Sequence, residues 1–249
     1  MRLIIDGYRD PYENMALDEA MLELRQRNEI PDTLRIYKWR PSAVTIGYFQ
    51  KIRDVVNLDY VEEHSIPVVR RITGGGAVYH DQYGELTYAI VMEVKKEFQD
   101  IEESYRRICS ALVYALKFLG LNASFKPIND IIVNGKKISG SAQIRRRNVL
   151  LQHGTLLVST NLEIMSKALR PPRIKLKAHG VLDISQWVTT ISIELKRKVE
   201  LDEVIGCLVR GFQKALNVEF TEDTVQKKEI ELAKKLETKY RSREWNFLR

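Results

Sequence analysis

The chain has 249 residues, of which 44% are hydrophobic, and a formal net charge of +7. This length and apolar content suffice for one substantial core, and no run of about eighteen apolar residues predicts a membrane span. The N-terminus lacks the apolar stretch of a signal peptide, so we expect a cytoplasmic protein without a membrane partner. The basic balance favours an acidic partner, which could be a nucleotide, an acidic protein or a nucleic acid.

The first fifty residues predict a strand, a helix and a hairpin. After a strand-like start, Asn14 is a candidate N-cap for a helix that extends to about residue 27. Residues 34–39 and 43–46 are predicted strands, paired as a hairpin through an Arg-Pro-Ser turn. The glycine and aromatic residues at 47–50 end this hairpin, where they either line an apolar pocket or cap the core.

A glycine-rich segment follows a short predicted helix at residues 59–64. It reads Arg70-Arg71-Ile72-Thr73-Gly74-Gly75-Gly76-Ala77-Val78-Tyr79-His80-Asp81. The glycines allow positive φ and leave no Cβ in the way of a ligand, so backbone N–H groups can point at an anion. The two arginines add donors suited to phosphate or carboxylate. The alternative interpretation is a tight hairpin with incidental arginines.

The rest of the chain alternates strands and helices without a linker or repeat. Strands are predicted at residues 85–92 and 150–158, and helices at residues 101–119, 201–216 and 224–240. We therefore expect a single α+β domain built around a mixed sheet that is flanked by helices. His153, an isolated histidine within a predicted buried strand, is interpreted as a hydrogen-bonded core residue.

A lysine-bearing hairpin is predicted at residues 129–143. Asn134-Gly135 between apolar runs is a two-residue hairpin turn, which pairs Ile132 with Lys137 and Asp130 with Ser139. Lys137 and Asp130 then share one face, because side chains alternate along a strand. Lys137 could hold an anion while Asp130 holds Mg²⁺; the alternative is a surface hairpin with a solvated ion pair.

Both motifs resemble signatures of the lipoate-protein ligase A family, which shares its fold with the biotin-protein ligases. The segment at residues 70–81 matches the first signature, and Lys-Ile-Ser-Gly-Ser-Ala at 137–142 matches the second. The resemblance covers nearly the whole chain. It implies that ATP and Mg²⁺ convert lipoate to lipoyl-AMP, and that the lipoyl group then passes to a lysine of a lipoyl domain. The expected acceptor is of the 2-oxoacid dehydrogenase E2 or glycine cleavage H protein type.

The resemblance also assigns roles to residues. Lys137 is the expected catalytic residue, Asn129-Asp130 resembles the metal-binding pair with Asp130 as the Mg²⁺ ligand, and residues 175–181 resemble a mobile adenylate-binding segment. Trp187 and Thr190 depart from the family's usual Arg and Asn. The lipoate pocket is expected to include Gly47, Gln50, Gly75 and His153. The substrate and ATP positions are Arg70, Arg71, Gly74, Gly75, Gly76, Ala77, Val78, Tyr79, His80, Asn129, Lys137, Ser139, Gly140, Ala142 and His153.

The C-terminal Glu-Trp-Asn-Phe marks the point where longer ligases continue into a small domain. Residues 1–249 therefore resemble the catalytic large domain of a bipartite, archaeal-type ligase that lacks the small C-terminal domain. We expect a separately encoded small protein to complete it.

Two other functions remain open. One is an octanoyltransferase that works from acyl carrier protein through a cysteine thioester. Such relatives carry an altered glycine loop and a cysteine near the lysine hairpin, whereas Cys109 and Cys207 here lie in predicted apolar helices as core residues. The other is a basic nucleic-acid-binding protein. Because no recognition motif accompanies the charge, we expect no nucleic acid partner.

Overall fold

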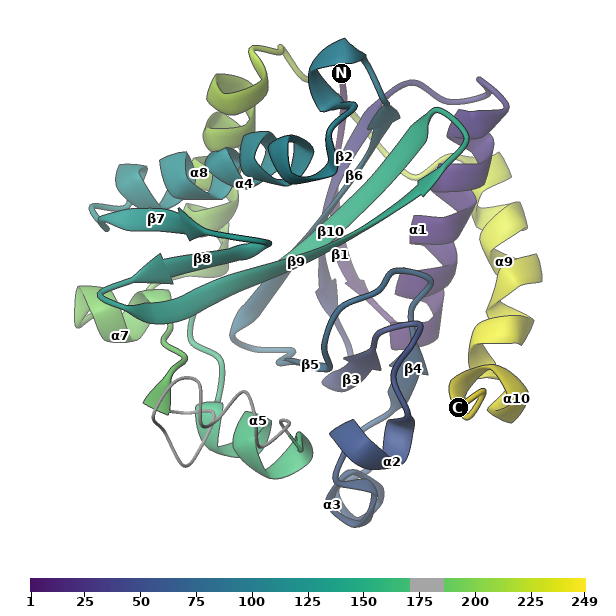
Figure 1. Cartoon of the computed structure of the whole chain (residues 1–249), viewed down its shortest axis with the longest axis vertical. Coiled ribbons are helices and arrows are strands. Elements are labelled where there is room, and N and C mark those ends of the chain that lie inside the picture. Colours follow the sequence, from purple (N-terminus) through teal and green to yellow (C-terminus); the bar gives the residue numbers. More distant parts are fainter. Residues whose placement is uncertain (171–185) are drawn as a thin grey trace.

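The computed structural model describes residues 1–170 and 186–249, which form a large central sheet with helices on both faces and a second, small sheet beside it (Figure 1). The large sheet has the strand order β11-β1-β2-β6-β10-β9-β8-β7, and the small sheet has the order β4-β3-β5. The strands are β1 (Arg2–Arg9), β2 (Thr33–Trp39), β3 (Ala43–Ile46), β4 (Val68–Arg70), β5 (Val78–His80), β6 (Glu85–Glu93), β7 (Ala123–Lys126), β8 (Asp130–Val133), β9 (Lys136–Arg146), β10 (Val149–Leu157) and β11 (Thr221–Asp223).

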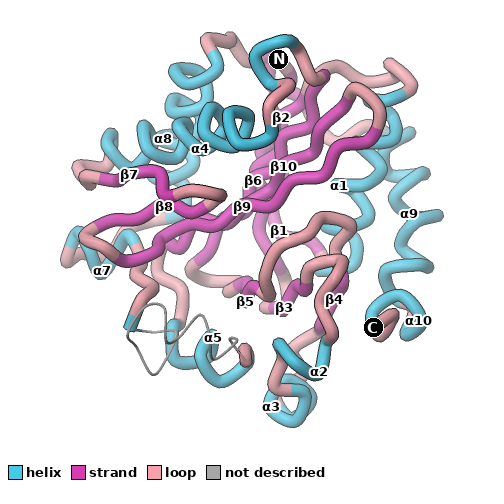
Figure 2. Tube along the Cα trace, viewed as in Figure 1, coloured by secondary structure: helices cyan, strands magenta, loops and turns pink. Residues whose placement is uncertain are grey.

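The longer helices cover the large sheet, whereas the short helices α2, α3, α5 and α10 lie around the small sheet (Figure 2). In the described part of the chain they are α1 (Pro11–Gln26), α2 (Ile52–Val55), α3 (Leu58–Glu63), the 3₁₀ turn η1 (Lys96–Phe98), α4 (Ile101–Phe118), α5 (Leu162–Ala168), α7 (Ile191–Leu195), α8 (Leu201–Leu216), α9 (Lys227–Arg241) and α10 (Arg243–Asn246). Within these residues, no helix has both the length and the apolar content needed to cross a membrane. The structure confirms the predicted α+β domain with a mixed sheet.

Strand alternation divides the apolar side chains of the large sheet between two cores. On β6, Tyr88 and Ile90 face the core beneath α4 and α8, whereas Ala89 and Val91 face the core beneath α1 and α9. A third apolar cluster joins the small sheet to α2, α3 and α5. The sheet is therefore buried on both faces over most of its area, which makes it a rigid platform for the site at its edge.

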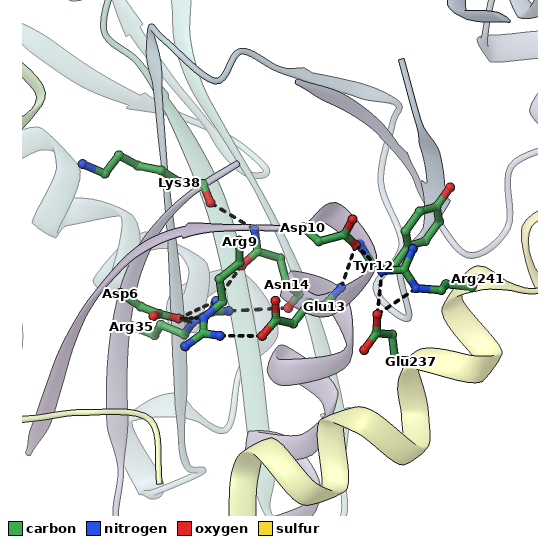
Figure 3. A network of polar contacts seen from close by, with 10 residues as sticks. All are labelled: Asp6, Arg9, Asp10, Tyr12, Glu13, Asn14, Arg35, Lys38, Glu237 and Arg241. Carbon is green, nitrogen blue, oxygen red and sulfur yellow. Dashed lines mark hydrogen bonds and ion pairs between the residues drawn. The ribbon is translucent and has the colours of Figure 1, made fainter. Parts of the chain in front are cut away.

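Buried polar contacts fix α1 against the sheet (Figure 3). The fully buried Arg35 on β2 donates from Nε to Asp6 Oδ2 at 2.8 Å and from Nη1 to Asp18 Oδ1 at 3.1 Å. Asn14 accepts from Arg35 and donates to the carbonyl of Lys38. The predicted cap at Asn14 is wrong, because Asp10 accepts from the first-turn N–H groups and starts the helix at Pro11.

The predicted pairing of residues 34–39 with residues 43–46 is also wrong. β2 and β3 belong to different sheets, so the turn between them connects the two sheets and does not form a hairpin. The alternative of a tight hairpin at the glycine loop does not form either, because the flanking strands β4 and β5 each pair with β3 and not with each other. Because β3 lies between them, the loop spans the width of a strand and has room to curve around a ligand.

The lysine hairpin forms with one change of register. Ile132 pairs with Lys137 as predicted, but a bulge shifts the next pairs, so that Asp130 lies opposite Gly140 rather than Ser139. An extra residue on one strand of a bulge re-aims the side chains beyond it. Here the bulge leaves the Asp130 carboxylate beside Lys137.

Candidate active site

A cavity of about 540 Å³ opens between the glycine loop, the lysine hairpin and the end of β10. This volume lies in the range of small-molecule sites. It gathers most of the residues that the sequence predicted, although Arg70, Gly47 and Gly74 are not among its lining. The predicted residues that line it are Gln50, Arg71, Gly75, Gly76, Ala77, Val78, Tyr79, His80, Asn129, Asp130, Lys137, Ser139, Gly140, Ala142 and His153.

The glycine loop is shaped by close backbone contacts. Gly75 has a φ of +90°, a conformation that favours glycine. A Cβ on Gly47 would lie 2.1 Å from the carbonyl oxygen of Gly75, so no side chain fits there. Gly47 therefore supports the loop from behind and does not line the cavity.

The Arg71 side chain fixes the glycine loop through hydrogen bonds to its backbone. Its guanidinium donates to the carbonyl oxygens of Gly74 at 2.7 Å and Gly76 at 2.8 Å, and to the hydroxyls of Thr45 and Thr73. Only 4% of the residue is exposed. Burial lowers the pKa of Arg71 to about 10, which leaves the side chain protonated at neutral pH. The cavity wall thus contains a buried positive charge.

Arg70 departs from its predicted role at the substrate. Its fully buried guanidinium donates to five backbone carbonyls, three in the segment at residues 47–50 and two within α10. Adjacent residues at a strand end point in opposite directions, so Arg71 reaches the cavity and Arg70 does not. Arg70 fastens the C-terminal helix to the loop that supports Gly75.

Replacing Arg70 with methionine should therefore cost stability. A charge-assisted hydrogen bond is worth about 1.5–3 kcal/mol, and the change leaves several buried carbonyls unpaired. We expect the free energy of unfolding, measured in denaturant, to fall by at least that amount. The matched Arg241→Met change removes a half-exposed arginine in surface ion pairs and should cost about 1 kcal/mol or less. Equal small losses in both variants would contradict this role.

The lysine hairpin brings a paired charge to the opposite wall. Lys137 Nζ lies 2.6 Å from Asp130 Oδ1, and both side chains are about one-third exposed, at 37% and 30%. A Cβ on Gly140 would lie 2.7 Å from Lys137 Nζ, so the glycine leaves the space that the ammonium group occupies. Asn129 donates to the carbonyl of Ser141 and braces the start of β8.

These residues do not by themselves form a magnesium site. The described residues contain no group of three or more His, Cys, Asp or Glu side chains that could hold a metal. The Asp130 carboxylate already has an ammonium partner, whereas Mg²⁺ requires several oxygen ligands. The assignment of Mg²⁺ to Asp130 stays a prediction.

Two buried histidines are part of the cavity wall. His153 lies with Nε2 2.7 Å from Thr73 Oγ1 and Nδ1 2.8 Å from Asp18 Oδ2. His80 stacks on Trp39, with Nε2 2.9 Å from Thr45 Oγ1 and Nδ1 3.3 Å from Glu85 Oε2. Burial lowers the pKa of His80 well below its usual value, so its imidazole is neutral. Both histidines reach Arg71 through a threonine.

The cavity also has apolar lining residues that were not predicted. They are Met15, Tyr37, Trp39, Leu157 and Met165, from α1, β2, β10 and α5. The sequence showed these residues only as core positions of separate elements. The one local signal was the spacing of Tyr37 and Trp39, two positions apart on a strand and hence on the same face. Trp187 and Val188, beyond residues 171–185, also line the cavity. The predicted lid at residues 175–181 lies outside the described residues.

Neither cysteine lines this cavity. Cys109 on α4 is fully buried, 3.6 Å behind Ser141 Oγ, and burial raises the pKa of its thiol to about 11. Cys207 on α8 is half-buried. Cys109 is a core residue as predicted, and its protonated, enclosed thiol is unsuited to nucleophilic attack.

Comparison with known proteins shows the family to which the chain belongs. Residues 10–213 match the family model described as the lipoyl protein ligase A/B catalytic domain. The chain belongs to this family. The predicted resemblance is thereby confirmed, together with the shared catalytic-domain fold.

Relatives within the family include both transferases and ligases. The chain is 34% identical to the octanoyltransferase LipM of Brevibacillus brevis, with 100% of this chain and 99% of that protein covered. One similar structure is that of a bi-partite lipoate protein ligase from Thermoplasma acidophilum, which was analysed together with its E2 lipoyl domain. Its TM-score is 0.85 at 34% identity, and the match covers 99% of this chain and 95% of that one. A lipoate-protein ligase A bound with ATP has a TM-score of 0.85 at 33% identity, covering 99% and 98%.

These relatives correct the predicted function. Curated proteins that match the whole chain at 31–34% identity, those of Brevibacillus brevis, Geobacillus kaustophilus and Bacillus subtilis, are octanoyltransferases. The prediction of ATP-dependent activation of lipoate is therefore wrong, and the octanoyltransferase alternative is favoured. The error has a physical reason. A glycine loop with a buried arginine binds the oxygen of an acyl group as readily as the oxygen of a phosphate, so the motif does not identify the acyl donor.

Proposed function

We propose that this enzyme transfers an octanoyl group from an acyl carrier protein thioester to a lysine of a lipoyl domain. The observation that carries the proposal is the lining of the cavity, in a chain that is 34% identical over its full length to an octanoyltransferase. Apolar and aromatic side chains line the cavity together with two cations, Arg71 and Lys137. An eight-carbon chain suits the apolar side chains and a reacting carbonyl suits the cations.

The apolar lining residues bind the acyl chain through burial alone. Tyr37 and Trp39 are fully buried, and their polar atoms are already bonded to Asp18 and Thr87, so neither offers a free polar group to the substrate. Each buried CH₂ of the acyl chain contributes about 0.8 kcal/mol. A free carboxylate would lose its hydration there, which favours the alkyl end of the substrate.

The reaction proceeds by direct transfer. The acceptor lysine, as a neutral amine, attacks the thioester carbonyl carbon; a C–N bond forms, the C–S bond breaks, and the amine proton leaves with the carrier's sulfur as a thiol. No thiol of this chain takes part, because the chain has two cysteines, one enclosed in the core and one on α8 away from the cavity. The products are an octanoyl-lysine amide and a free carrier thiol.

Lys137 and Arg71 stabilise the negative charge that develops on the acyl oxygen. Both cations face the same cavity, and fixed donors at a developing oxyanion lower the barrier without reorganisation. Asp130 holds the Lys137 ammonium in place through their 2.6 Å ion pair. Lys137 is thus the catalytic residue of this proposal, as the sequence predicted for a different donor.

A lipoyl domain is the acceptor that the family supports. The similar Thermoplasma ligase was studied with its E2 lipoyl domain. Whether the acceptor here is of the E2 or the H protein type stays a prediction, as does a separate small protein that completes the chain.

The proposal is tested with purified protein, octanoylated acyl carrier protein and a lipoyl domain. We expect a mass increase of one octanoyl group on the lipoyl domain, with release of one carrier thiol for each group transferred. A lipoyl domain whose acceptor lysine is replaced with arginine should remain unmodified. Absence of transfer to the intact domain by protein that remains folded would overturn the proposal.

The double variant Cys109→Ala, Cys207→Ala should retain octanoyl transfer. Neither thiol reaches the cavity, so kcat is expected to stay within about twofold, while small cavities in the core reduce stability by about 1 kcal/mol or more. Transfer rate and thermal unfolding measure the two effects separately. An octanoyl thioester trapped on either cysteine of the wild-type protein would contradict direct transfer.

A further inference from the structure

Arg71 is a buried cation whose partners are all neutral. Four of its N–H groups donate to the hydroxyls of Thr45 and Thr73 and to the carbonyls of Gly74 and Gly76. A guanidinium has five such donors, so one N–H is left without a partner among the described residues, in a side chain that lines the cavity. The direction in which this last N–H points depends on the groups that accept the other four N–H bonds.

The two threonine hydroxyls are themselves held by parallel chains of polar groups. In the first chain, Thr73 Oγ1 lies 2.7 Å from His153 Nε2, and His153 Nδ1 lies 2.8 Å from Asp18 Oδ2. In the second, Thr45 Oγ1 lies 2.9 Å from His80 Nε2, and His80 Nδ1 lies 3.3 Å from Glu85 Oε2. Each chain runs from a carboxyl group through an imidazole to a hydroxyl, and both end at Arg71.

The first chain has one consistent direction of donation. Asp18 accepts from Arg35 and Tyr37, so its carboxyl oxygens act as acceptors. Oδ2 then also accepts the N–H of His153 Nδ1, and in the tautomer with its proton on Nδ1 the ring's Nε2 is an acceptor. Thr73 donates its proton to Nε2 and keeps a lone pair for the Nε–H of Arg71. Asp18 is nearly fully buried, so this order is not disturbed by solvent.

The second chain fixes Thr45 from the other side. Burial raises the pKa of Glu85 and lowers that of His80, which favours a neutral carboxyl beside a neutral imidazole. The Glu85 O–H then donates to His80 Nδ1, and the Nε2–H donates to Thr45 Oγ1. The hydroxyl oxygen retains a second lone pair for Arg71 Nη1. Both chains thus present a hydroxyl oxygen to the guanidinium.

We infer that Thr45 and Thr73, each backed by its histidine and carboxyl group, are positioning residues that aim the free N–H of Arg71 at the acyl oxygen. The expected effect on kcat rests on the proposed octanoyl transfer. The hydrogen-bond pattern rests on the geometry alone. Hydrogen bonds to the side chain that carries the donor restrict its position and angle to the narrow range that a reacting group requires.

The kinetic test uses Thr45→Val, Thr73→Val and their double variant, which keep the side-chain shape and remove the hydroxyl. Each single change should lower kcat for octanoyl transfer about tenfold with little effect on KM, the loss expected for one net hydrogen bond in the transition state. Thr73→Ser and Thr45→Ser restore the hydroxyl and should restore kcat. Valine variants that keep kcat within twofold, or serine variants that fail to restore it, would overturn the inference.

A matched control separates positioning from stability. Thr33 on β2 is buried and its hydroxyl also accepts from an arginine, Arg2 Nε at 3.0 Å, far from the cavity lining. Thr33→Val should lower the melting temperature about as much as Thr73→Val and leave kcat unchanged. If Thr33→Val lowers kcat to the same degree, the effect of the valine variants is structural and the inference fails.

A spectroscopic readout tests the hydrogen-bond pattern without any turnover. The chain has four histidines, so ¹⁵N imidazole shifts can be assigned by single replacement. We expect His153 at mildly alkaline pH to carry its proton on Nδ1, and its Nε2 signal to shift in Thr73→Val but not in Thr33→Val. A proton on Nε2 would overturn the inference. If the wild-type protein transfers no octanoyl group, the proposed function fails, whereas these shifts still decide the inference.

Discussion

Replacing Lys137 with alanine is expected to lower kcat for octanoyl transfer by about 10²–10³-fold, the cost of removing one oxyanion donor. The ammonium lies at the cavity wall beside Asp130 and stabilises the charge on the acyl oxygen. The fold should tolerate the change, because the pair is about one-third exposed and the freed carboxylate can be hydrated. Transfer rates and thermal unfolding of the same preparations measure both effects.

Lys136 provides the control for that experiment. It is the adjacent lysine on β9, it is exposed, and it does not line the cavity. Lys136→Ala removes the same charge from the same hairpin and should change kcat by less than about twofold. A Lys137→Ala protein with near wild-type kcat, or equal losses in both variants, would show that the ammonium has no direct role.

Replacing Gly47 with alanine is expected to disturb stability and activity together. The new Cβ would lie 2.1 Å from the Gly75 oxygen and 3.1 Å from the Gly74 carbon, so the glycine loop must move. Because the contact is with backbone rather than a flexible side chain, we expect a loss of about 1–3 kcal/mol in the free energy of unfolding, typical of overpacking. Octanoyl transfer should fall at least tenfold, since the displaced loop no longer holds Arg71 against its carbonyls.

The matched change for that prediction is Gly206→Ala. Gly206 lies within α8, and a Cβ there meets nothing within 4 Å. Alanine should therefore stabilise the helix by about 0.5–1 kcal/mol and leave transfer unchanged. Denaturant unfolding and initial rates of transfer distinguish the two glycines. A Gly47→Ala protein that matches wild type in both measurements would mean that the loop does not depend on this contact.

The elements with strong local patterns were predictable. The helix at residues 201–216 was predicted with its observed bounds, because its apolar stripe is long and regular. The pairing of strands was less predictable. Whether two neighbouring strands pair depends on a third strand that inserts between them, as β3 does between β4 and β5, and no local pattern records that insertion. The bulge beside Asp130 escaped prediction because it changes register without changing the turn.

The site was predictable where a motif places several functional groups in one loop. Arg71, Lys137 and Asp130 all reach the cavity. Arg70 does not, because its partners lie at residues 47–50 and on α10, the latter about 175 positions away in sequence, and only tertiary contacts reveal them. The apolar lining residues were missed for the same reason, since they come from separate elements that meet only in the folded chain.

We expect the acyl donor to be a thioester rather than an adenylate, and a side-by-side donor assay distinguishes the two. The wild-type protein and a lipoyl domain are supplied either with octanoylated acyl carrier protein without ATP, or with free octanoate or lipoate and ATP. Acceptor mass and pyrophosphate are recorded in every reaction. The account predicts octanoylation from the carrier alone, with no pyrophosphate from the free acids. Modification of the acceptor only with a free acid and ATP, accompanied by pyrophosphate release, would contradict it.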